Sequence, residues 1–289
     1  MSDPNANPAQ FIATLEKAGE RRVTQNGDGD VVWRIWGQGE PLVLLHGGTG
    51  SWLHWVRNIE TLARDFRVLV PDLPGSGESA SPAPPISAEG VARSISAGIA
   101  SILGGETPFS IAGFSMGGLI AGYVASQSTP RARQVILVGS TGMEAPRAQM
   151  QPLVSWRRLP TEEEKIAAHR RNLGILMIYA PERIDALAVH AQARNAVASR
   201  VRGKHVSHTG VLSRCLTGFG GRIAGIWGEH DPTAAPHFEE RRVRLREFRP
   251  DASFELVAGV GHWVQYEAYE WFNKRVAALL NASGDLVLT

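Results

Sequence analysis

The segment FSIAGFSMGGLIAGYVAS, residues 109–126, contains an apolar run, a glycine-rich turn and a longer helical stretch. Residues 109–113 have the composition of a buried strand, and residues 116–126 have that of a helix. Between them lies a G-x-S-x-G sequence, in the strand-to-helix context that this motif requires. Glycine stands on both sides of Ser115, where so tight a turn has no room for a larger side chain. The segment predicts an exposed Ser115 hydroxyl at a helix N-terminus, where developing negative charge is favoured; the alternative is a plain helix cap.

The same alternation of short apolar runs and longer helical stretches continues along the chain, as in parallel strands joined by crossover helices. Residues 22–24 and 31–36 flank the turn sequence Asn26-Gly27-Asp28-Gly29 and predict a hairpin. Further strands are predicted at residues 41–45, 67–70, 109–113, 134–139, 222–227 and 253–257. The fold class is therefore α/β, with a mostly parallel central sheet and flanking helices.

The domain organisation predicted for the 289 residues is one core with an insertion. Residues 142–218 are long enough for several helices but contain no strong strand, so we interpret them as a helical cap. Within the cap, Thr161 and Glu164 form a capping box, and Pro181 suits a first helical turn. The core then comprises residues 21–141 and 219–289, and residues 1–20 form a peripheral segment with a helix near 9–20.

Composition excludes several classes of protein. The 30 Lys+Arg against 28 Asp+Glu leave a charge of +2, too little for the basic surface that nucleic acid binding needs. The single cysteine, Cys215, forms no intrachain disulfide and has no CxxC partner for a metal or redox site. No secretory signal and no apolar run of membrane-spanning length is visible, so we expect a cytoplasmic protein with no membrane partner. A homo-oligomer stays open.

A histidine is needed beside Ser115, because a serine hydroxyl is a weak nucleophile without a base. His262 lies in a glycine-rich loop that follows the predicted strand 253–257, at the same edge of the sheet as Ser115. His46, at the end of another strand, is the main competitor, and we interpret it as structural. The sequence predicts that His262 is the base.

A carboxylate should orient this histidine and stabilise its protonated form. Asp231 follows the predicted strand 222–227, and one crossover through a helix near 236–247 returns the chain to His262. Glu229 is the alternative. The order Ser115, Asp231, His262 is the order that this class of fold uses.

Acyl transfer also needs hydrogen-bond donors for the oxyanion. Met116 supplies the N–H that follows the serine. The second donor is expected in His46-Gly47-Gly48-Thr49-Gly50, where Gly48 is the first choice and Thr49 the next. Neither a phosphate-binding loop nor a dinucleotide-binding glycine motif is present, so no cofactor is expected.

The motifs together resemble those of the α/β-hydrolase superfamily, from about residue 31 to residue 280. They are LLHGGTG at 44–50, PDLPGSGES at 71–79, GFSMGG at 113–118, WGEHD at 227–231 and GVGHWVQYE at 259–267. SMGG and GHWVQYE resemble the branch of ring-cleavage-product (carbon–carbon bond) hydrolases and small-molecule carboxylesterases, in which a helical cap is inserted. The carbon–carbon hydrolases usually have Asn before the serine, whereas this chain has Phe114.

The cap carries 12 Lys+Arg against 6 Asp+Glu, so its net charge of +6 would favour an anionic substrate unless these residues only form a solvated surface. Arg194 falls in an apolar stripe with Leu187 and Ala191, which predicts either a structural ion pair or a clamp for a substrate carboxylate. We also expect Phe114, Trp263 and Thr49 to contact the substrate. His205 and His208 are interpreted as surface residues, so no metal site is predicted.

The function that the sequence predicts is cofactor-free cleavage of an ester or related acyl bond in a small molecule, with Ser115, His262 and Asp231 as the catalytic triad. The substrate is expected to carry a carboxylate if the cap charge acts on it. The alternatives are cleavage of a carbon–carbon bond in ring-cleavage-type diketones, and a weakly catalytic binding protein.

Overall fold

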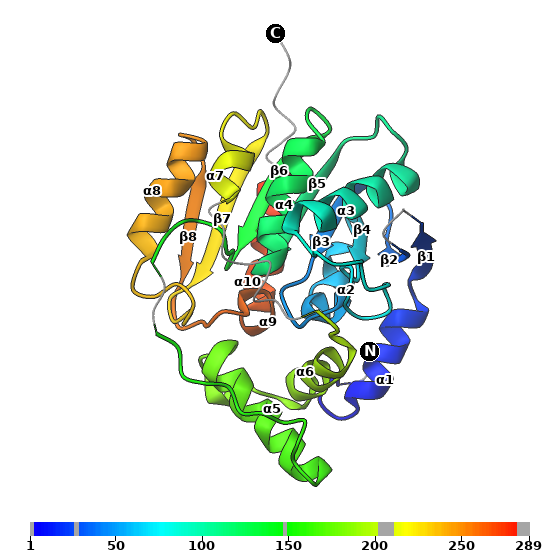
Figure 1. The fold of residues 1–289 in the computed structure, drawn as a ribbon, viewed down its shortest axis with the longest axis vertical. Helices are drawn as coiled ribbons and strands as arrows, with labels where there is room; N and C mark the ends of the chain where they lie inside the picture. Colours follow the sequence, from blue (N-terminus) through cyan, green and yellow to red (C-terminus); the bar gives the residue numbers. More distant parts are fainter. Residues whose placement is uncertain (1–2, 26–28, 147–148, 202–210, 282–289) are drawn as a thin grey trace.

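The computed structural model describes residues 3–25, 29–146, 149–201 and 211–281. Its centre is a sheet of eight strands in the order β1-β2-β4-β3-β5-β6-β7-β8 (Figure 1). The strands are β1 (Glu20–Thr24), β2 (Val31–Trp36), β3 (Glu40–Leu45), β4 (Phe66–Pro71), β5 (Phe109–Phe114), β6 (Ala132–Val138), β7 (Arg222–Gly228) and β8 (Ser253–Val257). β1 pairs with β2, and β2 with β4, in antiparallel register, and the remaining pairs are parallel.

The predicted α/β class and each predicted strand are confirmed. Short β-branched and apolar runs form parallel strands of this kind when both of their faces are buried. β2 is fully buried, and so are the C-terminal ends of β3 to β7. The antiparallel pair β1 and β2 confirms the predicted hairpin. Residues 26–28 of its turn lie outside the described residues.

Two layers of helices cover the sheet. One face packs on α3 (Ala88–Leu103), α4 (Met116–Gln127), α7 (Val211–Leu216) and α8 (Phe238–Phe248). The other face packs on α1 (Pro8–Lys17), η1 (Trp52–Trp55), α2 (Ile59–Leu62), α9 (Val264–Glu267) and α10 (Tyr269–Asn281). No helix in the described ranges is long and apolar enough to cross a membrane.

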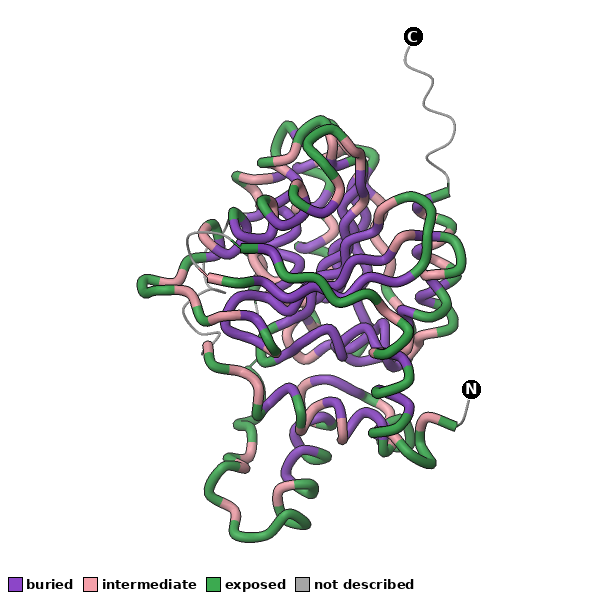
Figure 2. The backbone as a smooth tube through the Cα atoms, turned by 90° about the vertical axis from the view of Figure 1, so that its right-hand side faces the viewer, coloured by how far each residue is buried: buried purple, intermediate pink, exposed green. Residues whose placement is uncertain are grey.

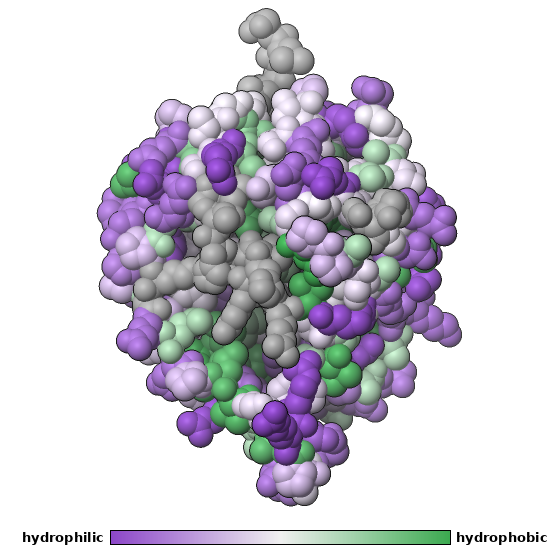
Figure 3. Space-filling view, viewed as in Figure 1, coloured by the Kyte–Doolittle hydropathy of each residue, from purple (hydrophilic) through white to green (hydrophobic). Residues whose placement is uncertain are grey.

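Two cap helices form a separate layer outside the sheet, as Figures 1 and 2 show. They are α5 (Glu162–Leu176) and α6 (Ala186–Ala198), and the short turn η2 (Pro181–Arg183) stands between them. Apolar side chains gather where this layer meets the core (Figure 3). Leu173, Met177 and Ile178 are buried in the same cluster as the core residues, so packing holds the cap on the core.

The predicted cap boundary needs a correction at α7. Leu212 and Leu216 of this helix are fully buried in the cluster that contains α4, and Leu212 lies against Gly122. α7 is therefore part of the core layer, although it falls within residues 142–218. Apolar residues at one-turn spacing pack equally well on either layer, so the sequence alone does not distinguish the two.

The capping signals placed the start of α5 correctly but not that of α6. Thr161 accepts the N–H of Glu164, and the Glu164 carboxylate accepts the N–H of Thr161. Pro181 instead begins the 3-10 turn η2, and Asp185 caps α6 by accepting the N–H of Ala188. The helix therefore starts at Ala186, five residues after the proline.

α1 is more tightly bound than a peripheral segment. Phe11, Ile12 and Leu15 are buried, and Trp36 donates its indole N–H to the Leu15 carbonyl. The N-terminal helix thus contributes to the core cluster that lies beneath the cap.

Candidate active site

Ser115 occupies the turn between β5 and α4 with backbone angles φ 53° and ψ −116°. A residue other than glycine rarely adopts this conformation, which stores strain. The flanking glycines are required: a Cβ on Gly113 would lie 2.2 Å from the Gly117 carbonyl oxygen, and one on Gly117 would lie 2.5 Å from that of His46. The Ser115 side chain makes no capping hydrogen bond to α4, so the turn presents a hydroxyl at the helix N-terminus without using it as a cap.

His262 and Asp231 form a buried pair, with 2.7 Å between His262 Nδ1 and Asp231 Oδ2. Their side chains are 3% and 0% exposed. The other carboxylate oxygen of Asp231 accepts the N–H and the hydroxyl of Thr233, both at 2.8 Å. Because Asp231 is fixed on both sides, it holds the histidine ring in one orientation.

Glu229, the alternative partner, is directed elsewhere. Its carboxylate accepts the N–H of Gly259 at 3.0 Å, and its side chain is 48% exposed. The structure therefore brings Asp231, and not Glu229, against His262.

The sheet brings Ser115 and the His262–Asp231 pair to one edge. Ser115 donates its N–H to Val138 at the end of β6, and Gly139 donates its N–H to Ile226 of β7. The ring of Phe114, next to Ser115, lies 4.8 Å from the His262 ring. Parallel strands end at a common edge, so the turn after β5 and the loops after β7 and β8 converge there.

His46 has a structural environment. It is fully buried, its Nε2 accepts the N–H of Leu73 at 2.8 Å, and its Nδ1 lies 2.8 Å from the Gly47 carbonyl oxygen. Burial lowers the pKa of this ring, although Asp72 and the Gly47 carbonyl act in the opposite direction. Both nitrogens are occupied, which agrees with the structural interpretation of His46.

The HGGTG loop after β3 presents open backbone at the same edge. Gly48 and Thr49 are exposed, and Thr49 has a φ of 51°. A Cβ built on Gly48 meets no atom of the described residues within 4 Å. Space beside Gly48 is thus free for a ligand, and its role as an oxyanion donor, like that of Met116, stays a prediction.

Two pockets meet at Gly48 and Thr49. The first, which we call the cap pocket, has a volume of about 350 Å³ and lies between this loop and the cap, with walls that include His54, Trp156, Met177 and Gln192. The second is a smaller, more enclosed apolar pocket against Met116, with Leu73, Ile120 and Val201 in its wall. The spaces on the two sides of this loop are therefore lined differently.

The match to known proteins decides the family. Residues 42–275 match the alpha/beta hydrolase family. The chain belongs to this family. It is therefore an enzyme of the hydrolase class, with the mostly parallel sheet and flanking helices typical of these proteins.

Named relatives of this hydrolase include dienedioate hydrolases and methyl ester esterases. It is 28% identical to the 2-hydroxy-6-oxononadienedioate/2-hydroxy-6-oxononatrienedioate hydrolase of Cupriavidus pinatubonensis, over 93% of this chain and 98% of that protein. It is 36% identical to the pimeloyl-(acyl-carrier protein) methyl ester esterase of Vibrio campbellii, a match that spans 42% of this chain and only 46% of that protein.

Solved structures confirm the fold. An esterase of Rhodococcus sp., RhEst1, aligns with a TM-score of 0.75 at 22% identity, over 92% of this chain and 100% of that one. A meta-cleavage product hydrolase, CumD, aligns with a TM-score of 0.70 at 20% identity, over 91% of this chain and 98% of that one. The hydrolase thus resembles both ester-cleaving and carbon–carbon-cleaving proteins.

Arg194 does not lie in the apolar stripe of α6, and the prediction that it does was wrong. Its side chain is exposed on α6, whereas the next residue, Asn195, is 0% exposed and accepts the Ser51 hydroxyl at 2.6 Å. The buried face of α6 comprises Leu187, Ala191 and Asn195. The buried position in the third turn is thus Asn195 and not Arg194, which is exposed to solvent. Gln192, two residues earlier, lines the cap pocket instead.

The positive charge of the cap lies on its surface. Among the basic cap residues that the structure describes, Lys165 is half-buried and the others are exposed. His205 and His208 lie outside the described residues. Charges at such positions act on a ligand through solvent, where they are screened.

Trp263 was expected to contact the substrate, but it lines neither of the two pockets. Its ring is fully buried, stacks on Tyr266 and donates its N–H to the His54 carbonyl at 2.9 Å. It therefore supports His54 from behind. Phe114 packs between the rings of His54 and His262, and its contact with substrate stays a prediction.

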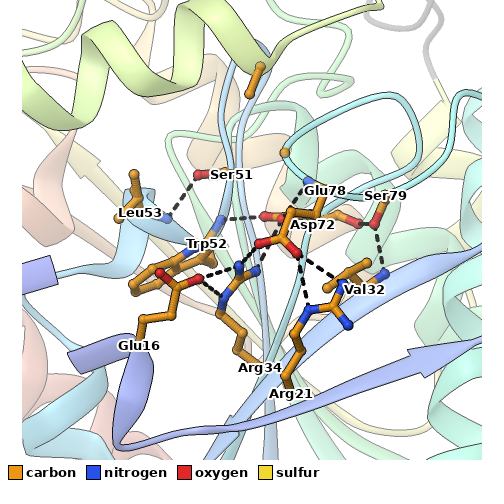
Figure 4. Close-up of polar contacts among 12 residues, drawn as sticks. Glu16, Arg21, Val32, Arg34, Ser51, Trp52, Leu53, Asp72, Glu78 and Ser79 are labelled. Carbon is orange, nitrogen blue, oxygen red and sulfur yellow. Dashed lines mark hydrogen bonds and ion pairs between the residues drawn. The ribbon is translucent and has the colours of Figure 1, made fainter. Parts of the chain in front are cut away.

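A buried ionic cluster supports the segment that follows the HGGTG loop (Figure 4). Asp72 accepts the N–H of Trp52 with one carboxylate oxygen and the N–H of Glu78 and the Arg34 guanidinium with the other. Arg34 also binds Glu16 and Glu78 and lies over the Trp52 ring. This cluster joins α1, β2 and the loop after β4 to the start of η1.

Glu267 links the His262 loop to the cap. Its carboxylate accepts three backbone N–H groups, from Gly261 at 2.7 Å, Ala180 at 2.9 Å and Tyr179 at 3.1 Å. Trp263 donates its N–H to the Met177 carbonyl at 2.7 Å in the same junction. Sequence reasoning missed Glu267, because its partners Tyr179 and Ala180 lie far away in the sequence.

Proposed function

We propose that the protein is a serine hydrolase that cleaves ester or related acyl bonds of small molecules, with Ser115 as nucleophile, His262 as base and Asp231 as the residue that orients His262. The observation that carries this proposal is the strained Ser115 turn at the same sheet edge as the buried His262–Asp231 pair. Such strain is retained when the surrounding structure fixes it, and it is common at catalytic residues.

In the proposed reaction, His262 removes the Ser115 proton as the hydroxyl oxygen attacks the carbonyl carbon. The oxyanion accepts the N–H groups of Gly48, which lines both pockets, and of Met116, which lines the smaller one. His262 then gives the proton to the leaving group. Water hydrolyses the acyl-enzyme by the same steps, with His262 again as base.

Carbon–carbon bond hydrolysis is the second candidate, because the relatives that match nearly the full chain are named for dienedioate hydrolysis. Phe114 instead of Asn before the serine counts against it. The exposure of Arg194 also removes the expected partner for a dienedioate carboxylate. We therefore place ester cleavage first.

A fluorophosphonate probe and a substrate panel test the proposal together. The probe should label Ser115, as peptide mass spectrometry would show, and labelling should abolish turnover of p-nitrophenyl esters. A vinylogous 1,5-diketone in the same panel measures carbon–carbon cleavage. Labelling of another residue would disprove the nucleophile, and probe labelling without turnover of any substrate would favour a binding protein.

A further inference from the structure

His54 is a buried histidine beside the candidate active site. It lies in η1, is 1% exposed, and packs edge-on against Phe114 and Trp263, each with 5.2 Å between ring centroids. It also lines the cap pocket together with Gly48 and Thr49. Gly50 is required beside it, because a Cβ there would lie 2.3 Å from His54 Cε1. The ring therefore has one fixed position.

The tautomer of His54 follows from its partner. Gly47 donates its backbone N–H to Nδ1 at 3.2 Å, so Nδ1 carries no proton. A neutral ring must then carry its proton on Nε2. Burial, together with the nearby His46 and His262, holds the pKa of His54 well below its usual range, which agrees with a neutral ring.

The Nε2–H group of this tautomer is buried and has no hydrogen-bond partner among the described residues. A buried donor left unpaired is destabilising, and it gains a hydrogen bond when a ligand supplies an acceptor. His54 is one of the residues that line the cap pocket, and Trp263 fixes its backbone by donating to the His54 carbonyl.

We infer that His54 Nε2–H donates to a neutral acceptor oxygen of the substrate, so the cap pocket selects uncharged substrates with a second carbonyl, ether or hydroxyl group. This inference rests on the proposed function and names its substrate class. It differs from the sequence-based expectation of a carboxylate.

The other polar walls of the cap pocket are also suited to neutral groups. Gln192 contributes an amide, and the Asn172 amide is already paired with the backbone of Val154. Arg157 is exposed, donates to the Ala196 carbonyl and lies over the Trp156 ring. No buried cation stands in the part of this wall that the structure describes. A carboxylate would lose hydration there, and Arg157, the arginine in this wall, already donates to the Ala196 carbonyl and stacks on Trp156, whereas a carbonyl loses less hydration.

Three esters of nearly equal size test the selection. They are p-nitrophenyl hexanoate, p-nitrophenyl 5-oxohexanoate and mono-p-nitrophenyl glutarate, which end in a hydrocarbon, a ketone and a carboxylate. Pentyl acetate, 4-oxopentyl acetate and 4-acetoxybutanoate present the same ends on the alcohol side. In one of the two sets, kcat/KM should be about tenfold or more higher for the ketone than for the other two members. Equal values in both sets would overturn the inference.

Two variants separate binding from positioning. His54→Phe keeps a ring but has no nitrogen, so it should lower turnover generally and also remove the preference for the ketone. His54→Asn can still accept the Gly47 N–H but is too short to reach the pocket, so it should recover turnover of the hydrocarbon ester without recovering the preference. Equal losses on all substrates, with the preference kept, would show that His54 only positions the loop. Thermal unfolding of each variant verifies that it folds.

Nitrogen NMR of histidine-labelled Ser115→Ala protein tests the inference without turnover. The free protein should show His54 protonated on Nε2, and heptane-2,6-dione should shift this resonance while glutarate should not. A proton on Nδ1, or no response to the dione, would overturn the inference. If the wild type cleaves no ester but the dione still shifts Nε2, the proposed function fails and the binding site stands.

Discussion

Gly139 shows how closely the candidate triad is packed against the sheet. It follows β6 with a φ of 52°, and a Cβ built on it would lie 3.0 Å from His262 Nδ1 and 3.3 Å from Asp231 Oδ2. The strand end thus forms the wall behind the hydrogen bond between these two side chains. A glycine there serves both the backbone conformation and the position of His262.

We expect Gly139→Ala to lower kcat by about 10- to 100-fold, because a misplaced catalytic group costs rate even when the fold survives. Gly218→Ala is the matched control, since Gly218 also has a positive φ of 79° but has nothing within 4 Å of an added Cβ. Both variants should lose about 1–2 kcal/mol of unfolding free energy. If both retain wild-type kcat, Gly139 does not position the pair.

Asp231→Asn should lower kcat by about 10⁴-fold, because an amide holds the wrong tautomer of the histidine. Glu229→Gln should change it little, since Glu229 contacts the loop backbone at Gly259 and the His230 ring but not His262. Steady-state kinetics on one ester decides between them. A larger loss for Glu229→Gln would transfer the role to that residue.

At the level of single residues, Ser115, Asp231 and His262 could be predicted because each follows a recognisable strand. His54 and Glu267 could not, since their roles depend on contacts between distant segments. His54 Nδ1 meets Gly47 through a turn of η1, and Glu267 meets Tyr179 and Ala180 of the cap.

Among the helices, α9 holds the junction between cap and core. Glu267→Gln leaves one carbonyl oxygen for three N–H donors and places an NH₂ group against at least one of them. We expect a loss of about 1–3 kcal/mol in unfolding free energy from the unpaired donors. Urea unfolding measures this loss, and hydrogen exchange should increase at residues 177–181.

Turnover should also fall in Glu267→Gln, because Gly261 precedes His262. Glu270→Gln is the control, since Glu270 is exposed at the start of α10. Equal effects of the two substitutions would show that the cap junction does not depend on the Glu267 carboxylate.

Strands were easier to predict than the register of the cap helices. An apolar run that ends in glycine or a turn fixes a buried strand to within about two residues. In α6, by contrast, alanine on several sides leaves two adjacent stripes nearly equivalent, and the Ser51–Asn195 hydrogen bond selects the stripe without Arg194. That partner lies far away in the sequence, so no local pattern contains it.

For the whole molecule, buried neutral histidines should make stability depend on pH. Burial lowers the pKa of His46 and His54 in the folded protein below the value of about 6.5 expected in the unfolded chain. The unfolded state therefore binds more protons as the pH falls through 6.5, and stability decreases. Each histidine contributes at most about 1.4 kcal/mol per pH unit.

Unfolding free energy measured between pH 7.5 and 5, above the range in which most carboxylates titrate, should therefore decrease toward acid. In His54→Asn, the unfolding free energy should fall less steeply below pH 6.5. The difference in slope should correspond to at most one bound proton. An identical slope in this variant and the wild type would mean that His54 is protonated in the folded protein.

The central claim for the molecule is that Ser115 is the nucleophile of a hydrolase. The most direct measurement is kcat for Ser115→Ala on the best ester of the panel, with thermal unfolding to verify the fold. We predict a loss of at least about 10³-fold with an unchanged melting temperature, because only a hydroxyl that makes no capping hydrogen bond is removed. A folded variant that retains a tenth of the wild-type activity would contradict the claim.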